Sequence, residues 1–250
     1  MPGAEVTWKQ DLWVAILAGP PRTVASHSSA AALRGLLLPP ASPHVTVPRG
    51  SSGRFPGAVI HHATVSNADR CRVEQMPTTG VARTVVECAA LLDQDALNGM
   101  VDAAFGRGLS TYGRVRAAWE RAGRVRGGDL LDEALAPYTA DVRLGSEKEA
   151  HVMRRLHQWG VPPPVRQYRI HDQNGRFLAQ VDFAWPAWRF GLEYDGDEPH
   201  PPRRWALDDA RLARLEALGW RIEQADRNDL RPSSTRLRAL LFQVLCQPAA

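Results

Sequence analysis

One stretch of the chain, residues 181–196 (VDFAWPAWRFGLEYDG), predicts two neighbouring β-strands joined by a tight turn. Successive side chains of a strand point to opposite faces of the sheet, so apolar residues at alternate positions mark a buried face. The acidic residues Asp182, Glu193 and Asp195 stand between those apolar positions and are predicted to share the other face. The stretch therefore constrains the fold to one with a sheet that gathers three carboxylates on one side.

The turn determines how these two strands pair. If residues 185–188 form it, Asp182 lies roughly opposite Gly191 and diagonal to Glu193, with Cβ atoms about 7 Å apart or closer. Carboxylates this close repel one another unless a cation lies among them, and oxygen ligands suit Mg²⁺ or Mn²⁺. Such ions activate water and neutralise phosphate charge. The alternative interpretation is a solvent-exposed sheet face, on which alternating acids cost little.

Composition limits the class of protein. The 250 residues suffice for two modest domains, each with its own core. No apolar run is long enough to cross a bilayer and no basic-then-apolar leader opens the sequence, so we expect a cytoplasmic protein with no membrane partner. Three cysteines without paired spacing favour neither a disulfide framework nor a zinc site. The net charge of +4 is compatible with a polyanionic partner, and equally with many proteins that have none.

Helix and strand patterns divide the chain near residue 143. Residues 1–143 predict an α+β region with helices at 26–38, 78–92, 97–105 and 112–121, strands at 44–48 and 58–65, and a loop at 123–129. Thr78 or Thr79 is the expected cap of the second of these helices. Residues 144–250 predict an α/β domain with helices at 146–159, 203–218 and 233–245 and strands at 166–170, 176–183, 189–195 and 220–224.

The order of the second region, αβββαβ with acids on its second and third strands, resembles the PD-(D/E)XK or restriction-endonuclease-like fold with its mixed sheet. The motifs SxxE, VDFAWP, EYDG with a nearby His, and DxxRxxxLxxxGW are more closely similar to actinobacterial proteins related to the very-short-patch-repair endonucleases. Here they are Ser146 and Glu149, residues 181–186, residues 193–196 with His200, and Asp208, Arg211, Leu215, Gly219 and Trp220. The resemblance spans residues 145–230 and implies a Mg²⁺- or Mn²⁺-dependent endonuclease that acts on DNA.

The first region also resembles a known family. The segments SHSSAAALRGL, HVTVP and TTGVARTVVECA are similar to the AbiEi-type antitoxin region that often precedes such a nuclease-like domain. Relatives usually begin with a winged-helix module, and we expect no complete winged helix here because little sequence stands ahead of Val24. The resemblance implies a cognate toxin protein as a possible partner.

The nuclease resemblance assigns roles to individual residues. It implies that Asp182 and Glu193 bind the metal, with Glu149 as a further ligand or as the group that orients a metal-bound water. Asp195 stands where the motif places lysine, so the water must be polarised by another group, for which His200 and Arg211 are the candidates.

Structural interpretations stand beside these roles. Glu149 lies three residues after Ser146, the spacing of a capping box. Arg204, Asp208 and Arg211 recur at helical spacing and predict an intrahelical ion-pair stripe, with contact to DNA phosphate as the second interpretation of both arginines. His61, His62 and His151 show no metal-ligand spacing and fit strand or surface positions.

Three functions follow from these patterns. The first is a metal-dependent endonuclease of the very-short-patch-repair-like type. The second is a non-catalytic antitoxin-like or transcriptional regulatory protein that uses the nuclease fold as a scaffold for nucleic acid or a toxin, because a fold does not fix a function. The third, a structure-specific repair nuclease, shares the chemistry of the first and differs only in its substrate.

Overall fold

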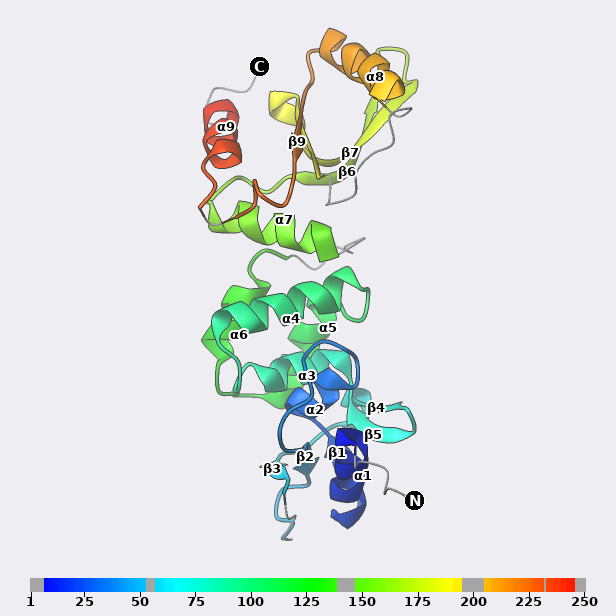
Figure 1. Cartoon of the computed structure of the whole chain (residues 1–250), viewed down its shortest axis with the longest axis vertical. Helices are drawn as coiled ribbons and strands as arrows, with labels where there is room; N and C mark the ends of the chain where they lie inside the picture. The colour runs from blue at the N-terminus through cyan, green and yellow to red at the C-terminus, as the bar shows by residue number, and fades with distance from the viewer. Residues whose placement is uncertain (1–6, 53–56, 139–146, 195–204, 232, 246–250) are drawn as a thin grey trace, which may run out of the picture. The chain divides into compact units, whose positions relative to one another are not determined.

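The computed structural model describes residues 7–52, 57–138, 147–194, 205–231 and 233–245. The chain forms two compact units, residues 1–147 and residues 148–250. Both contain helices and a mixed β-sheet, so the predicted combination of helices with mixed sheets is confirmed (Figure 1). Within the part of the chain that the structure describes, no helix combines the length and the apolar composition that a bilayer crossing requires.

The first unit is built on a five-stranded sheet in the order β3-β2-β1-β5-β4. The strands are β1 (Val24–Ala25), β2 (His44–Val47), β3 (Val59–His62), β4 (Arg70–Val73) and β5 (Met76–Thr79). Helix α1 (Trp8–Ala18), which the sequence patterns did not predict, begins with a capping box at Thr7 and contacts β1 and β2. Its buried residues join Ala25, Val45 and Met76 in one apolar core.

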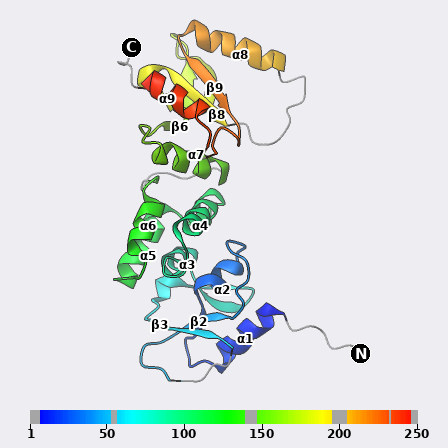
Figure 2. The same cartoon turned by 60° about the vertical axis from the view of Figure 1, so that its left-hand side comes forward.

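The remaining helices of the first unit lie together beside this sheet (Figure 2). They are α2 (His27–Ala32), α3 (Val81–Cys88), α4 (Gln94–Gly106), α5 (Tyr112–Ala122) and α6 (Gly128–Leu135). The side chains of Asp93 and Thr111 cap α4 and α5 by accepting a backbone N–H of the first turn. Gly127 precedes α6 with φ of 78°, and a Cβ there would lie 1.9 Å from the carbonyl oxygen of Ala89, so only glycine fits.

Three local predictions for the first unit were wrong. Thr78 and Thr79 do not cap a helix, because both belong to β5, where Thr78 pairs with Ala25; the N-cap of α3 is Gly80. The helix expected at 26–38 ends at Ala32. The expected loop at 123–129 gives way to α6 from Gly128. Pairing between distant strands overrode local preference in the first case, since threonine suits both a cap and a strand.

The second unit has the predicted order of elements. They are α7 (Glu147–Gln158), β6 (Val165–His171), β7 (Phe177–Trp185), β8 (Phe190–Tyr194), α8 (Trp205–Ala217), β9 (Arg221–Ala225) and α9 (Arg236–Leu245), with a 3-10 turn, η2 (Pro186–Trp188), before β8. The sheet order is β6-β7-β8-β9, antiparallel up to β8, with β9 parallel to β8. Leu215 and Trp220 pack against Ile170, Ala179, Val181 and Ala184 to form the core.

Candidate functional site: the acids of the second unit

The pairing of β7 with β8 differs from the predicted register. Gly191 pairs with Ala184, so the expectation that it faces Asp182 was wrong by two positions. The turn begins one residue later than expected, because Trp185 still belongs to β7 and Arg189 closes the turn with a left-handed φ of 47°. The last pair of the two strands is Phe183↔Leu192, so Asp182 and Glu193 are the next residues beyond the paired positions of β7 and β8.

Two hydrogen bonds orient the Asp182 carboxylate. The backbone N–H of Tyr194 donates to its Oδ2 at 3.1 Å, and Nε2 of Gln167 donates to its Oδ1 at 3.1 Å. Both donors come from neighbouring strands, β8 and β6. The carboxylate is therefore held in one orientation by the sheet on both of its sides.

Glu149 reaches the same place from helix α7. The Nε2 atom of Gln167 lies 3.3 Å from its Oε1, and Nη2 of Arg166 donates to its Oε2 at 2.7 Å. One amide nitrogen thus contacts both Glu149 and Asp182, which are far apart in sequence. Ser146 lies outside the described residues, so these bonds identify partners of Glu149 on β6 and leave the capping-box interpretation untested.

Glu193 has an arginine partner. Nη1 and Nη2 of Arg211 donate to its two carboxylate oxygens, each at 2.8 Å, which is the bidentate geometry of a strong charge-assisted pair. Arg211 therefore reaches from α8 to β8, a contact that the ion-pair stripe of the sequence interpretation did not include. The side chains of Arg204 and Asp208 lie outside the described residues, as do Asp195 and His200.

The side chains that meet at Gln167 could offer mainly oxygen atoms as ligands to a metal ion. Among the described residues, no three His, Cys, Asp or Glu side chains are arranged to hold a metal ion. Two carboxylates, Glu149 and Asp182, do share one point, and the amide of Gln167 occupies it. Rotation of that amide about its terminal bond would break the bond that Oε1 accepts from Nε2 of Gln180 and would present Oε1 in place of Nε2. Carboxylate and amide oxygens are ligands that Mg²⁺ accepts. The chemistry of these side chains fits a hard cation.

Gln167 was missed by the sequence interpretation. It is a polar residue within β6, and its backbone adopts a left-handed φ of 47°. Such a conformation is unusual for a residue other than glycine and is found most often at functional or strained sites. No local pattern marks it, because its role depends on the pairing of β6 with β7 and on the position of α7.

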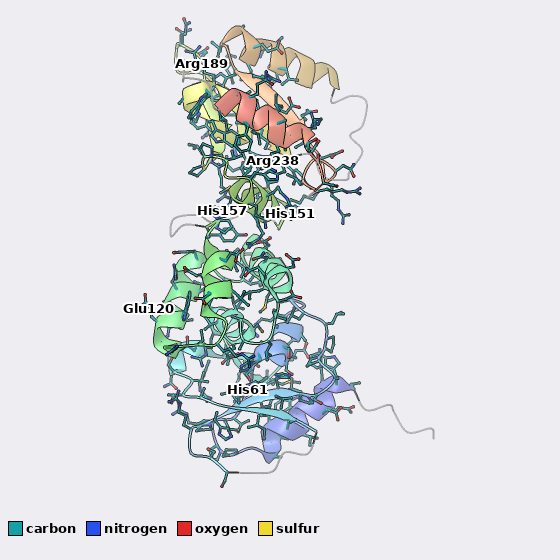
Figure 3. All side chains as sticks on the ribbon, turned by 90° about the vertical axis from the view of Figure 1, so that its left-hand side faces the viewer. His61, Glu120, His151, His157, Arg189 and Arg238 are labelled. Carbon is teal, nitrogen blue, oxygen red and sulfur yellow. The ribbon has the colours of Figure 1, made fainter. Side chains whose placement is uncertain are left out.

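A second cluster of titratable residues lies in the first unit. The rings of His27 and His61 stack with centroids 3.4 Å apart, and Nδ1 of His44 lies 3.0 Å from Nε2 of His61 (Figure 3 labels His61). The predicted strand position of His61 is confirmed, and His151 is exposed on α7 as expected. The contact among the three rings was not predicted, since it requires the parallel pairing of β2 with β3 and the approach of α2.

A buried ion pair lies beneath this histidine cluster. The backbone N–H of His27 donates to Oε2 of Glu87, whose Oε1 accepts Nε of Arg83 at 2.9 Å. Burial raises the pKa of Glu87, and the charge of Arg83 opposes that shift. Burial is also the main reason why the pKa of His27 is lowered to about 2 and that of His61 to about 4, with neighbouring histidines adding to the effect. The rings are therefore neutral near pH 7.

Comparison with known proteins identifies relatives in Mycobacterium tuberculosis. Two uncharacterized proteins, MT2308 and Rv2248, come from two strains of that organism and are each 32% identical to this chain over 193 residues. The matched segment covers 76% of this chain and 68% of each relative. The chain belongs to the family of these mycobacterial proteins. No family model matches it.

Proposed function

We propose that this protein is a metal-dependent endonuclease that hydrolyses phosphodiester bonds in DNA, of the very-short-patch-repair-like type. One observation carries the proposal: Glu149 on α7 and Asp182 on β7 converge on a single amide nitrogen of Gln167, and Tyr194, the neighbour of Glu193 on β8, donates its backbone N–H to Asp182. The element order αβββαβ with a mixed sheet supports a PD-(D/E)XK-like core, in which acids from these elements serve together.

The proposed chemistry assigns a task to each side chain. Glu149 and Asp182, with the amide oxygen of Gln167, would hold Mg²⁺ or Mn²⁺, which supplies an activated water and offsets phosphate charge. In hydrolysis a water oxygen bonds to phosphorus, one ester bond breaks, and the departing oxygen takes up a proton. Arg211 is placed to exchange its partner, Glu193, for a phosphate oxygen, because guanidinium binds both groups with the same fork, and this exchange would free Glu193 as a further ligand of the metal. Asp195 and His200 stay as candidate assisting residues, and Arg204 as a candidate DNA contact.

Incubation of the purified protein with supercoiled plasmid DNA and Mg²⁺ or Mn²⁺ tests the proposal. We expect nicked or linear product, and a loss of roughly 100-fold or more in Asp182→Ala because a ligand is removed. Glu216→Ala is the matched control. Glu216 is an exposed acid on α8, so this substitution removes the same charge at another position. Equal cleavage by the two variants, or no cleavage by the unaltered protein at any metal concentration, would contradict the proposal.

A non-catalytic scaffold is the second candidate, and one observation favours it. The bidentate pair with Arg211 already neutralises Glu193, so this acid has a partner without any metal. In that case the antitoxin-like first unit would carry the function, with a cognate toxin protein or DNA as partner. Thermal unfolding separates the two candidates, since millimolar Mg²⁺ stabilises a protein that binds it and leaves a scaffold unchanged.

A further inference from the structure

A cavity of about 250 Å³ opens in the first unit, where β2 and β3 end and β4 begins. Its lining includes Arg22, Thr46, Val65 and Arg70, and it includes no acidic side chain. We refer to it as the Arg22–Arg70 cavity. It belongs to the sheet of the first unit, so it is separate from the acids of the second unit.

The two arginines of this cavity are paired with neutral groups. Nη2 of Arg22 donates to the side-chain oxygen of Asn67 at 3.1 Å. Arg70 donates to the backbone carbonyl oxygens of Val65 and Arg22. Neither arginine forms an ion pair within the described residues. Two positive charges thus face one small space without a counter-charge.

The acid that precedes Arg70 in the chain does not compensate them. Asp69 precedes Arg70 in the chain, and its carboxylate is buried and bound by Arg121, whose Nη2 lies 2.6 Å from Oδ1. Ser66 donates a further hydrogen bond to Oδ2. Burial and the charge of Arg22 lower the pKa of the Arg70 guanidinium from its ordinary value, as expected for a cation that has a cationic neighbour.

A buried hydroxyl adds an unused polar group. Thr46 lines the cavity with only 1% of its surface exposed, and its Oγ1 has no hydrogen-bond partner among the described residues. Buried polar atoms in native proteins almost always have a partner, so an unpaired one points to a missing water or ligand. Arg22 also adopts a left-handed φ of 75°, a costly conformation that is found preferentially at binding sites.

We propose that the Arg22–Arg70 cavity binds a phosphate group. A tetrahedral oxyanion matches the fork of a guanidinium, brings the missing negative charge, and can accept from a hydroxyl such as that of Thr46. The volume admits inorganic phosphate, and it also admits the terminal phosphate of a nucleotide with part of its sugar. This site extends the protein's chemistry beyond the acids of the second unit and does not depend on the nuclease proposal.

Isothermal titration of the full-length protein with inorganic phosphate tests this proposal, at constant ionic strength maintained with NaCl. We expect saturable binding to one site and an increase in melting temperature with phosphate. Arg22→Gln and Arg70→Gln should each weaken binding by about tenfold or more, since each removes one charge-assisted contact. Thr46→Val keeps the shape of the side chain and should weaken binding less, without lowering the melting temperature.

Arg72→Gln is the matched control. Arg72 is an exposed residue on the same strand as Arg70, does not line the cavity, and donates to the carbonyl oxygen of Gln75. The Arg72→Gln variant should bind phosphate as tightly as the unaltered protein. If Arg70→Gln fails to fold, Arg22→Gln still tests the proposal. The side chain of Arg22 is exposed and bonds only to Asn67 among the described residues, so its replacement should not disturb folding. Absence of phosphate binding, or equal binding by Arg22→Gln and Arg72→Gln, would overturn the proposal.

Competition identifies the source of the phosphate. A deoxynucleotide trimer with a 5′-phosphate and the same trimer with a 5′-hydroxyl are titrated against bound phosphate. Displacement by the phosphorylated trimer alone supports a nucleic-acid end as the ligand, and displacement by neither supports free phosphate. Asp182→Ala should bind phosphate as tightly as the unaltered protein, so the outcome is independent of nuclease activity.

Discussion

Each unit of this protein contains an arginine–glutamate pair joined through strong hydrogen bonds, and the two pairs differ in burial. In the first unit, Arg83 and Glu87 expose only 6% and 4% of their side chains. In the second, Arg211 and Glu193 expose 26% and 17%. Glu87 also accepts from the backbone of His27 and from the hydroxyl of Thr79, whereas Glu193 accepts from Arg211 through both of its oxygens.

This difference separates a structural pair from an exchangeable one. The buried Arg83–Glu87 pair is sealed from solvent, and we refer to it as the sealed pair. Removal of one partner from it leaves a charge without water or counter-ion, which is costly. Solvent reaches the partly exposed pair of the second unit, so a metal ion or a phosphate group can replace either partner at a lower cost than in the buried pair. The pair of the first unit should therefore control folding, and the pair of the second unit should respond to ligands.

The largest expected effect comes from breaking the sealed pair. Glu87→Ala should lower the free energy of unfolding by about 3–5 kcal/mol, because Arg83 is then buried without its partner. Glu193→Ala should cost less, because solvent can hydrate the Arg211 guanidinium that is left without its partner. Urea denaturation followed by circular dichroism measures both values. Similar losses in the two variants would show that burial does not distinguish the pairs.

An intermediate effect is expected from pH, and it is confined to the first unit. The pKa of His27 is lowered to about 2 and that of His61 to about 4, against 6.5 for an ordinary histidine. The unfolded chain therefore takes up protons below pH 6.5 while the folded histidine cluster does not, so stability is lost as pH falls from 6.5 toward 4. Protonation of Glu87, whose pKa is raised, opposes this loss.

Unfolding measured at pH 7, 6 and 5 tests the sign and the location of this effect. We expect a decrease on the order of 2 kcal/mol over this range. His61→Phe should reduce the decrease, whereas replacement of the exposed His157 on α7 by Asn should leave it unchanged. A pH response that survives in His61→Phe and disappears in the His157 variant would place the sensitive group in the second unit and contradict this prediction.

The smallest expected effect concerns the exchangeable pair. Arg211→Gln removes a cation that competes for Glu193, so the affinity for Mg²⁺ should rise by about two- to fivefold. Calorimetric titration with MgCl₂ measures this change. Arg214→Gln, an exposed charge on the same helix, is the control and should have no effect. Weaker Mg²⁺ binding in Arg211→Gln would mean that the arginine organises the acids and does not compete for them.

Local signals in the sequence predicted much of the second unit. Proline and glycine punctuation, such as the prolines after Trp159 and the turn closed by Asp172, determines where its elements begin and end. These signals act over a few residues. The order of helices and strands, and the positions of Glu149, Asp182 and Glu193 on α7, β7 and β8, therefore follow from sequence alone.

Contacts that depend on distant pairing could not be predicted in this way. The register of β7 with β8 depends on the left-handed backbone of Arg189. Arginine rarely adopts this conformation, so the sequence does not predict it. The role of Gln167 and the stacking of His27 on His61 depend on which strands are neighbours. In the first unit, where strands of two to four residues come from scattered segments, local periodicity carries less information.

The parallel pairing of β9 with β8 has a consequence for the newly made chain. A ribosome releases β8 first, and its outer edge stays open until residues 221–225 have emerged. Arg211 emerges in the same interval, so Glu193 receives its neighbouring strand and its counter-charge almost together. The acids thus reach their final surroundings only after β9 has been made, and a chain cut short before β9 would expose an unpaired strand edge that other chains can bind.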